Sequence, residues 1–186
     1  MKAQHGFHNR IVTAFLLFFL TCLPVFSQTA ALDNLFDRLQ QAGAAEAQRI
    51  EREIWLEWSK SGSAAMDLLL ERGREAMAMG DNAAAIEHLT ALTDHDPAFA
   101  EGWNARATAY FNAGLLGPSI SDIGHVLTLN PRHFGALAGL GMIFEELQRP
   151  EKALEVYRAA LAINPQMPGI LDAVKRLETD LAGQDL

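Results

Sequence analysis

The chain has 186 residues, of which 49% are hydrophobic and 20% are charged, a composition typical of a globular domain with a substantial core. Its formal net charge is −8 with 15 basic residues, so its electric field repels nucleic acid and anionic lipid headgroups, and we expect no binding to nucleic acid. Cys22 is the only cysteine, which excludes an internal disulfide and a cysteine-based metal site within one chain.

Residues 1–27 have the pattern of a signal peptide. Lys2 and Arg10 precede an apolar run over residues 11–23, and Ser27 suits a cleavage site before the next residue. The run is shorter than the ~20 residues of a membrane-spanning helix, so we expect cleavage, export to the periplasm and no membrane insertion afterwards. A retained or lipid-linked anchor that faces the periplasm is the alternative. Cleavage would leave 13 basic and 23 acidic residues, a net charge of −10.

Residues 28–65 are expected to be helical and to precede a regular array. The 34-residue period of that array places Trp55 under Leu89, but Glu51 falls where alanine is expected. The segment is therefore either an N-terminal cap or a degenerate repeat. Trp55 and Trp58 lie one helical turn apart. We expect them to pack against the first regular repeat, with an exposed aromatic contact site as the alternative.

A 34-residue period governs the next hundred residues. Prolines recur at this interval at positions 97, 131 and 165, and an Asp or Asn precedes each one, which indicates the end of a helix and a turn. Each unit contains two amphipathic helical patterns. The aligned positions of the first pattern are Leu69, Trp103 and Leu137; Gly73, Ala107 and Gly141; and Ala76, Tyr110 and Phe144. Those of the second are Ala85, Ser119 and Ala153, then Leu89, Ile123 and Tyr157.

This pattern resembles the tetratricopeptide repeat, in which Trp-x2-Leu-Gly-x2-Tyr is followed by Ala-x3-Phe and then Pro. The unit that starts near Trp103 departs from it by Arg106 for Leu, Ala107 for Gly and Ser119 for Ala. The resemblance implies an all-α fold, an α-solenoid of helix-turn-helix repeats over 66–99, 100–133 and 134–167. Small residues at position 8 of each unit would allow the paired helix to approach closely.

Residues 168–186 are expected to form a C-terminal capping helix and tail. Pro168 begins a run in which Ile170, Leu171, Val174 and Leu177 share one face. This face would cover the last repeat.

The sequence contains no convincing catalytic or metal-binding pattern, and we expect a non-enzyme without cofactors. The glycine-rich stretch over 135–141 lacks a preceding strand and a third glycine in register, so it does not match a dinucleotide-binding loop. Asp94, His95 and Asp96 precede a turn, but no second set has the spacing of a zinc site.

The resemblance also implies where a ligand would bind, because members of this family contact ligands through positions 2, 5, 9 and 12 of each first helix. The residues that the resemblance assigns to partner binding are Asp67, Leu70, Arg74, Met77, Glu101, Asn104, Thr108, Phe111, Met142 and Glu145. Gly135 and Ala138 occupy the remaining two positions.

This residue set suggests the chemistry of the partner. It contains no lysine, and acidic side chains outnumber its one arginine, so an acidic C-terminal tail is not the expected ligand. The Met, Leu and Phe side chains suit a peptide or amphipathic helix with some basic character. We therefore expect a scaffold or adaptor in cell-envelope assembly that binds a protein or peptide in a concave groove. The alternative is a lipid-anchored or self-associating structural component of the envelope.

Overall fold

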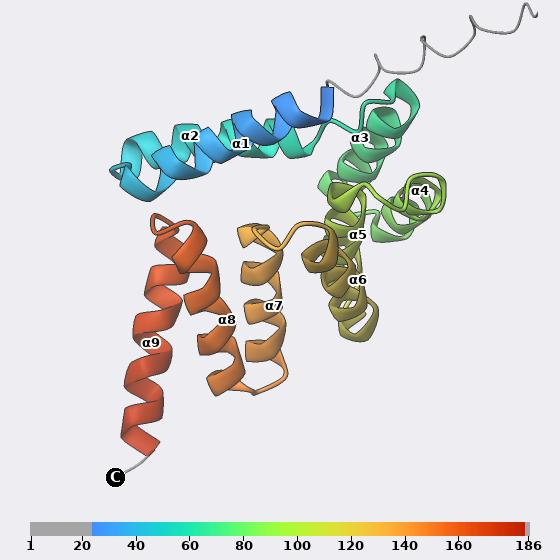
Figure 1. Ribbon diagram of the computed structural model, residues 1–186. Helices are drawn as coiled ribbons and strands as arrows, with labels where there is room; N and C mark the ends of the chain where they lie inside the picture. The colour runs from blue at the N-terminus through green and yellow to red at the C-terminus, as the bar shows by residue number, and fades with distance from the viewer. Residues whose placement is uncertain (1–23, 185–186) are drawn as a thin grey trace, which may run out of the picture.

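The structure, a computed structural model, describes residues 24–184, and within them the chain forms nine α-helices and no strand (Figure 1). The predicted all-α solenoid is confirmed. The helices are α1 (Pro24–Gln41), α2 (Ala44–Trp58), α3 (Ala64–Ala78), α4 (Asn82–His95), α5 (Ala100–Asn112), α6 (Leu116–Leu129), α7 (Phe134–Glu146), α8 (Pro150–Ile163) and α9 (Pro168–Gln184). Most of the predicted signal peptide, residues 1–23, lies outside the described residues.

Helices α3 to α8 form three consecutive antiparallel pairs, α3–α4, α5–α6 and α7–α8, and each pair packs on the next. Helices α4, α6 and α8 each end one residue before the Asp or Asn that precedes the repeated proline. Close packing within a pair occurs where the sequence places small residues. A Cβ atom added at Gly73 would collide with the Leu89 side chain, and one added at Gly141 would collide with the Tyr157 ring. Position 8 therefore must be small for the two helices to meet.

The turn inside each pair requires a left-handed residue. Gly80, Gly114 and Gln148 occupy the same position of successive units and have φ angles of 77°, 72° and 54°. In each turn the amide of the following residue donates to a carbonyl in the last turn of the preceding helix, as in Asp81 N to Ala76 O at 2.9 Å. The first two units use glycine, for which this conformation is unstrained, and the third uses glutamine.

The capping helix α9 packs on α8. Leu177 is buried in a cluster with Leu154 and Tyr157, and Ile170, Val174 and Leu181 pack around it. The prediction that Leu171 belongs to the buried face is wrong, because this side chain is 44% exposed. No helix within residues 24–184 is long and apolar enough to cross a membrane.

Helices α1 and α2 pack on each other and do not stack on α3 as a further repeat would. Instead this hairpin lies across the ends of α7, α8 and α9 (Figure 1). Its apolar side chains form one cluster with Phe134 at the start of α7, with Ile163 at the end of α8 and with Met167 in the turn before α9. The prediction that Trp55 and Trp58 pack against the first repeat is wrong, since both rings contact Phe134 in the third repeat.

The acidic outer face of α3 explains why the hairpin does not pack on this helix. In α5 and α7 the positions that pack on the preceding pair are small or apolar, as at Ala105 and Ala109, which are 4% and 0% exposed. In α3 the corresponding residues are Glu71 and Glu75, and both are exposed. Because stacking a helix on these carboxylates would remove them from water without partners, α3 ends the solenoid.

Candidate functional site

An open cavity of about 290 Å³ lies between α5 and α7 on the face formed by the first helices. Phe111 and Met142 line it, together with small residues such as Ala107 and Gly139. Met142 is 48% exposed. All residues that line the cavity are uncharged. The sequence-predicted residues that the structure brings together here are Asn104, Thr108, Phe111 and Met142, and Gly135 and Ala138, from the two remaining positions of the frame, line the same cavity.

The polar groups at the edge of this cavity come from α5. The Asn104 amide donates to the Glu101 carboxylate, with a nitrogen–oxygen distance of 3.2 Å. The Thr108 hydroxyl donates to the backbone carbonyl of Asn104 at 3.0 Å, and its side chain is exposed. The side-chain amide oxygen of Asn104 can accept a hydrogen bond from a ligand that lies along α5.

A buried polar network links three first helices next to this cavity. Glu101, which is 2% exposed, accepts hydrogen bonds from Arg74 of α3, Asn104 of α5 and His133 at the start of α7. The His133 Nδ1 atom accepts the Ala136 amide at 3.0 Å, so the ring proton lies on Nε2 and is donated to Glu101 at 3.1 Å. Arg74 and Glu101, both predicted partner-binding residues, are therefore already paired with each other inside the chain.

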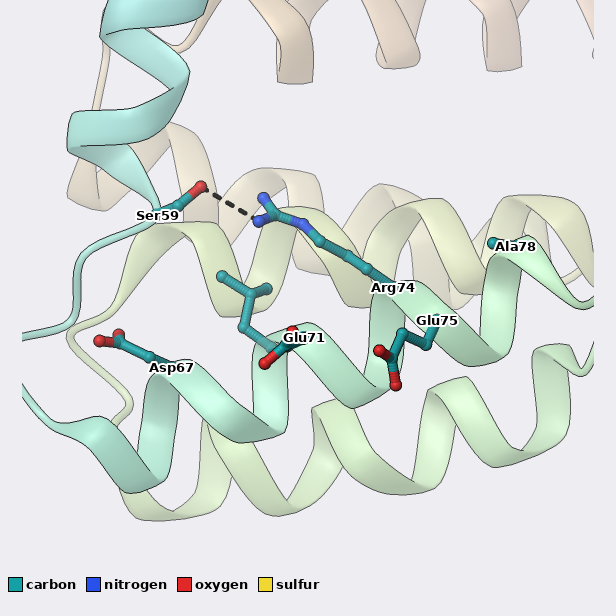
Figure 2. Close-up of a pocket in the computed structure, with 7 residues that line it drawn as sticks. Ser59, Asp67, Glu71, Arg74, Glu75 and Ala78 are labelled. Carbon is teal, nitrogen blue, oxygen red and sulfur yellow. Dashed lines mark hydrogen bonds between the residues drawn. The ribbon is translucent and has the colours of Figure 1, made fainter.

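A second hollow, of about 390 Å³, lies on α3 beside the end of α2 (Figure 2). Arg74 projects over it and donates to the Ser59 hydroxyl at 3.1 Å, while the Glu71 and Glu75 carboxylates extend from the helix below. Asp67 lies at its other end and accepts hydrogen bonds from the amide and hydroxyl of Ser61. This hollow is acidic, in contrast to the uncharged cavity between α5 and α7.

The remaining predicted residues contact other parts of the chain. Leu70 is 2% exposed, and Met77 packs against the first hydrophobic cluster. Glu145 accepts hydrogen bonds from the Tyr157 hydroxyl at 2.8 Å and from Arg176 of α9. Burial, together with the hydrogen bond to Glu145, raises the pKa of Tyr157 above its ordinary value. Glu145 thus connects the third repeat to the capping helix.

Sequence analysis missed two residues at this face, namely His133 and Ser59. A histidine directly before a helix start is a possible N-cap, which could have drawn attention to His133. The role of Ser59, like the contact of Trp55 with Gly135, depends on α2, whose position no local pattern specifies. Among the described residues, no three His, Cys, Asp or Glu side chains are grouped in a way that could hold a metal ion.

The family model of the tetratricopeptide repeat matches residues 70–118 and 119–168. A TPR repeat-containing protein of Rhizobium etli is 38% identical over 153 residues, which cover 82% of this chain and 75% of that protein.

Solved structures extend this similarity to the fold. The first TPR of Spaghetti (RPAP3), bound to the HSP90 peptide SRMEEVD, is 26% identical with a TM-score of 0.61, over 64% of this chain and 95% of that one. The MamA protein is 20% identical with a TM-score of 0.60, over 86% of each chain. At this identity the second likeness concerns the fold alone.

Proposed function

Since this chain belongs to the tetratricopeptide-repeat family, we propose that it is a non-catalytic scaffold or adaptor that binds a segment of a partner polypeptide between α5 and α7. Repeats of this family are protein-interaction modules, and stacked helix pairs give them an extended concave surface. The observation that carries the proposal is the uncharged cavity with Phe111 and Met142 in its walls. An apolar side chain of the partner would fill it, with the partner backbone hydrogen-bonded to Asn104.

The chemistry of the groove supports a partner unlike the acidic HSP90 peptide of the Spaghetti complex. Arg74 is the one cation among the predicted contact positions, and its guanidinium already pairs with Glu101. The exposed carboxylates of Glu71 and Glu75, together with the net charge of −8, favour basic rather than acidic segments. We therefore propose a partner segment with an apolar anchor and flanking basic residues.

The proposed place of action is the periplasm, in assembly of the cell envelope. The signal-like pattern of residues 1–27 supports export, with processing between Ser27 and Gln28. Mass determination of the mature N-terminus tests this step, and recovery of the full-length chain in the cytoplasm would exclude it. A lipid-anchored or self-associating component of the envelope is the alternative, which sedimentation of the purified chain would distinguish.

Site-specific crosslinking in the native cell tests the groove itself. A photoreactive residue at Thr108, exposed beside the cavity, should capture the partner, whereas one at Glu87, exposed on α4, should not. Once a partner is captured, Phe111→Ala is expected to weaken binding by more than ~1 kcal/mol, as is common for buried aromatic anchors. The matched control is Glu155→Ala on α8. Equal losses from both variants, with melting temperatures unchanged, would favour an edge or terminal surface instead.

A further inference from the structure

The α1–α2 hairpin is held on the repeats at both of its ends. Near the turn between its helices, the Gln40 amide donates to the carbonyls of Ala162 and Ile163, at 2.9 and 2.7 Å. Asp33 accepts a hydrogen bond from Arg132 at 2.6 Å. These repeat residues lie at the turn before α7 and at the end of α8, before the capping helix α9, so the hairpin runs along one edge of the concave face.

At its other end the hairpin covers a position at which members of this family contact ligands. The Trp55 ring lies on Gly135, the second residue of α7, and a Cβ atom there would be 2.6 Å from Trp55 Cη2. Trp58 stacks on His133, which in turn donates to Glu101 at the corresponding position of the second repeat. The hairpin therefore occupies the start of the groove in the second and third repeats, and the cavity beside it remains open.

The surface that the hairpin covers on the edge of the concave face is apolar. Phe134 is fully buried there, and Ile163 and Met167 pack against the same cluster. The hairpin is joined to α3 through Ser59-Lys60-Ser61-Gly62-Ser63, in which Gly62 has a φ angle of 83°. Ser61 donates to Asp67 and Ser59 accepts from Arg74, so the linker is anchored to α3, and its glycine and serine residues provide the pivot about which the hairpin opens.

We propose that α2 is an intramolecular ligand of the groove, and that the α1–α2 hairpin is a cover that opens as one unit to expose the edge around Gly135 and Phe134. The external partner that fits this edge is a helix with an aromatic residue in the place of Trp55. Such a partner competes with the hairpin, so docking of the hairpin lowers affinity at the start of the groove. The competition rests on the proposed function, but opening of the hairpin does not.

A matched pair of glycine substitutions in the full chain tests the opening. Gly135→Ala places a methyl group against the Trp55 ring, whereas Gly124→Ala on α6 adds one where no atom lies within 4 Å. Both changes replace glycine by alanine within a helix, at the second residue of α7 and in the middle of α6. Amide hydrogen exchange of α1 and α2 should accelerate about tenfold or more in Gly135→Ala, with exchange of α4 and α6 unchanged, and should not change in Gly124→Ala.

A second variant removes hairpin contacts without altering α7. Gln40 is exposed, and Gln40→Ala loses only the two hydrogen bonds to the turn after α8. It should accelerate exchange of the same two helices by about threefold or more, because these two hydrogen bonds hold the hairpin on the end of α8. In both variants, fluorescence of the apolar dye bis-ANS should increase over that of the parent.

Two results would overturn the proposal. One is unchanged exchange of α1 and α2 in both variants, and the other is equal acceleration of the hairpin and of α3 to α8, which would make the hairpin an integral part of one cooperative unit. Failure of Thr108 crosslinking would count against the binding groove but would leave these exchange results as they are. The two proposals are therefore separable.

Discussion

The indole ring of Trp58 lies nearly parallel to the imidazole of His133, with ring centroids 4.2 Å apart and planes at 18°. The same histidine accepts the Ala136 amide as the N-cap of α7 and donates to the buried Glu101. One side chain thus joins the hairpin, the second repeat and the third repeat.

We expect His133→Ala to destabilise the protein by about 2 to 4 kcal/mol. The variant loses the helix cap, worth ~1 kcal/mol, and removes one of the donors to a carboxylate that is 2% exposed. The stability of His133→Asn should lie between those of His133→Ala and the parent, because asparagine caps a helix but is too short to reach Glu101. Urea unfolding of the three proteins checks this order. A His133→Ala midpoint within error of the parent would contradict the role given to the network.

The turn between α7 and α8 offers a stabilising substitution. Gln148 has a φ angle of 54°, in the left-handed region, where Gly80 and Gly114 serve the other two repeats. We expect Gln148→Gly to stabilise the protein by about 0.5 to 1 kcal/mol, the strain relieved being partly offset by the greater freedom of glycine in the unfolded chain. Thermal unfolding provides the measurement. Gly114→Ala, the reverse change in the preceding turn, should destabilise, and stabilisation by both changes would rule out this explanation.

The helix pairs and their turns could be predicted from the sequence because each depends on residues close together in the chain. The 34-residue spacing of the prolines and of Gly73, Ala107 and Gly141 specifies where helices end and where they approach closely. The same pattern appears in the helix bounds and in the packing of Leu89 and Tyr157.

The position of the hairpin could not be predicted in this way. It depends on contacts between residues about 80 to 120 positions apart, such as Trp55 with Phe134 and Gln40 with Ala162. The acidic residues at Glu71 and Glu75 were the available signal, since the corresponding residues of α5 and α7, which pack on a preceding pair, are small or apolar. The candidate groove positions followed from the alignment of this sequence with the repeat pattern. That alignment does not show that Arg74 and Glu101 form an ion pair with each other.

Tyr157 should make stability depend on alkaline pH. Its phenol is buried and hydrogen-bonded to Glu145, which raises the pKa of Tyr157 above the ordinary value of 10.0. Above that value the unfolded chain releases this proton while the folded chain retains it, so the stabilisation is fully present below pH 10 and is lost as the pH rises further. We expect Tyr157→Phe to be less stable than the parent by ~1 kcal/mol at neutral pH, and the difference to shrink above pH 10. Urea titrations of both proteins at several pH values check this, and a difference that stays constant would contradict it.

Arg106 departs from the family pattern, which has leucine at this position, and its role explains why. The guanidinium binds both carboxylate oxygens of Asp122, at 2.7 and 3.0 Å, and also donates to the Thr93 hydroxyl at 2.8 Å. The side chains of Arg106 and Asp122 are only 11% and 5% exposed. The hydrogen bond to Asp122 raises the pKa of Arg106, so the guanidinium is charged throughout the usual range of pH. In the third repeat the same two positions carry Leu140 and Val156.

Replacing only one residue of the Arg106–Asp122 pair should therefore destabilise the protein far more than replacing both. Arg106→Leu leaves the Asp122 carboxylate buried without its cation, and we expect a loss of about 3 to 5 kcal/mol. Arg106→Leu combined with Asp122→Val introduces the residues of the third repeat, and should recover most of that loss because neither variant side chain carries a charge. A double-mutant cycle with urea unfolding measures the coupling between the two positions. If the double variant is destabilised by the sum of the two single changes, the buried ion pair is not what makes these positions interdependent.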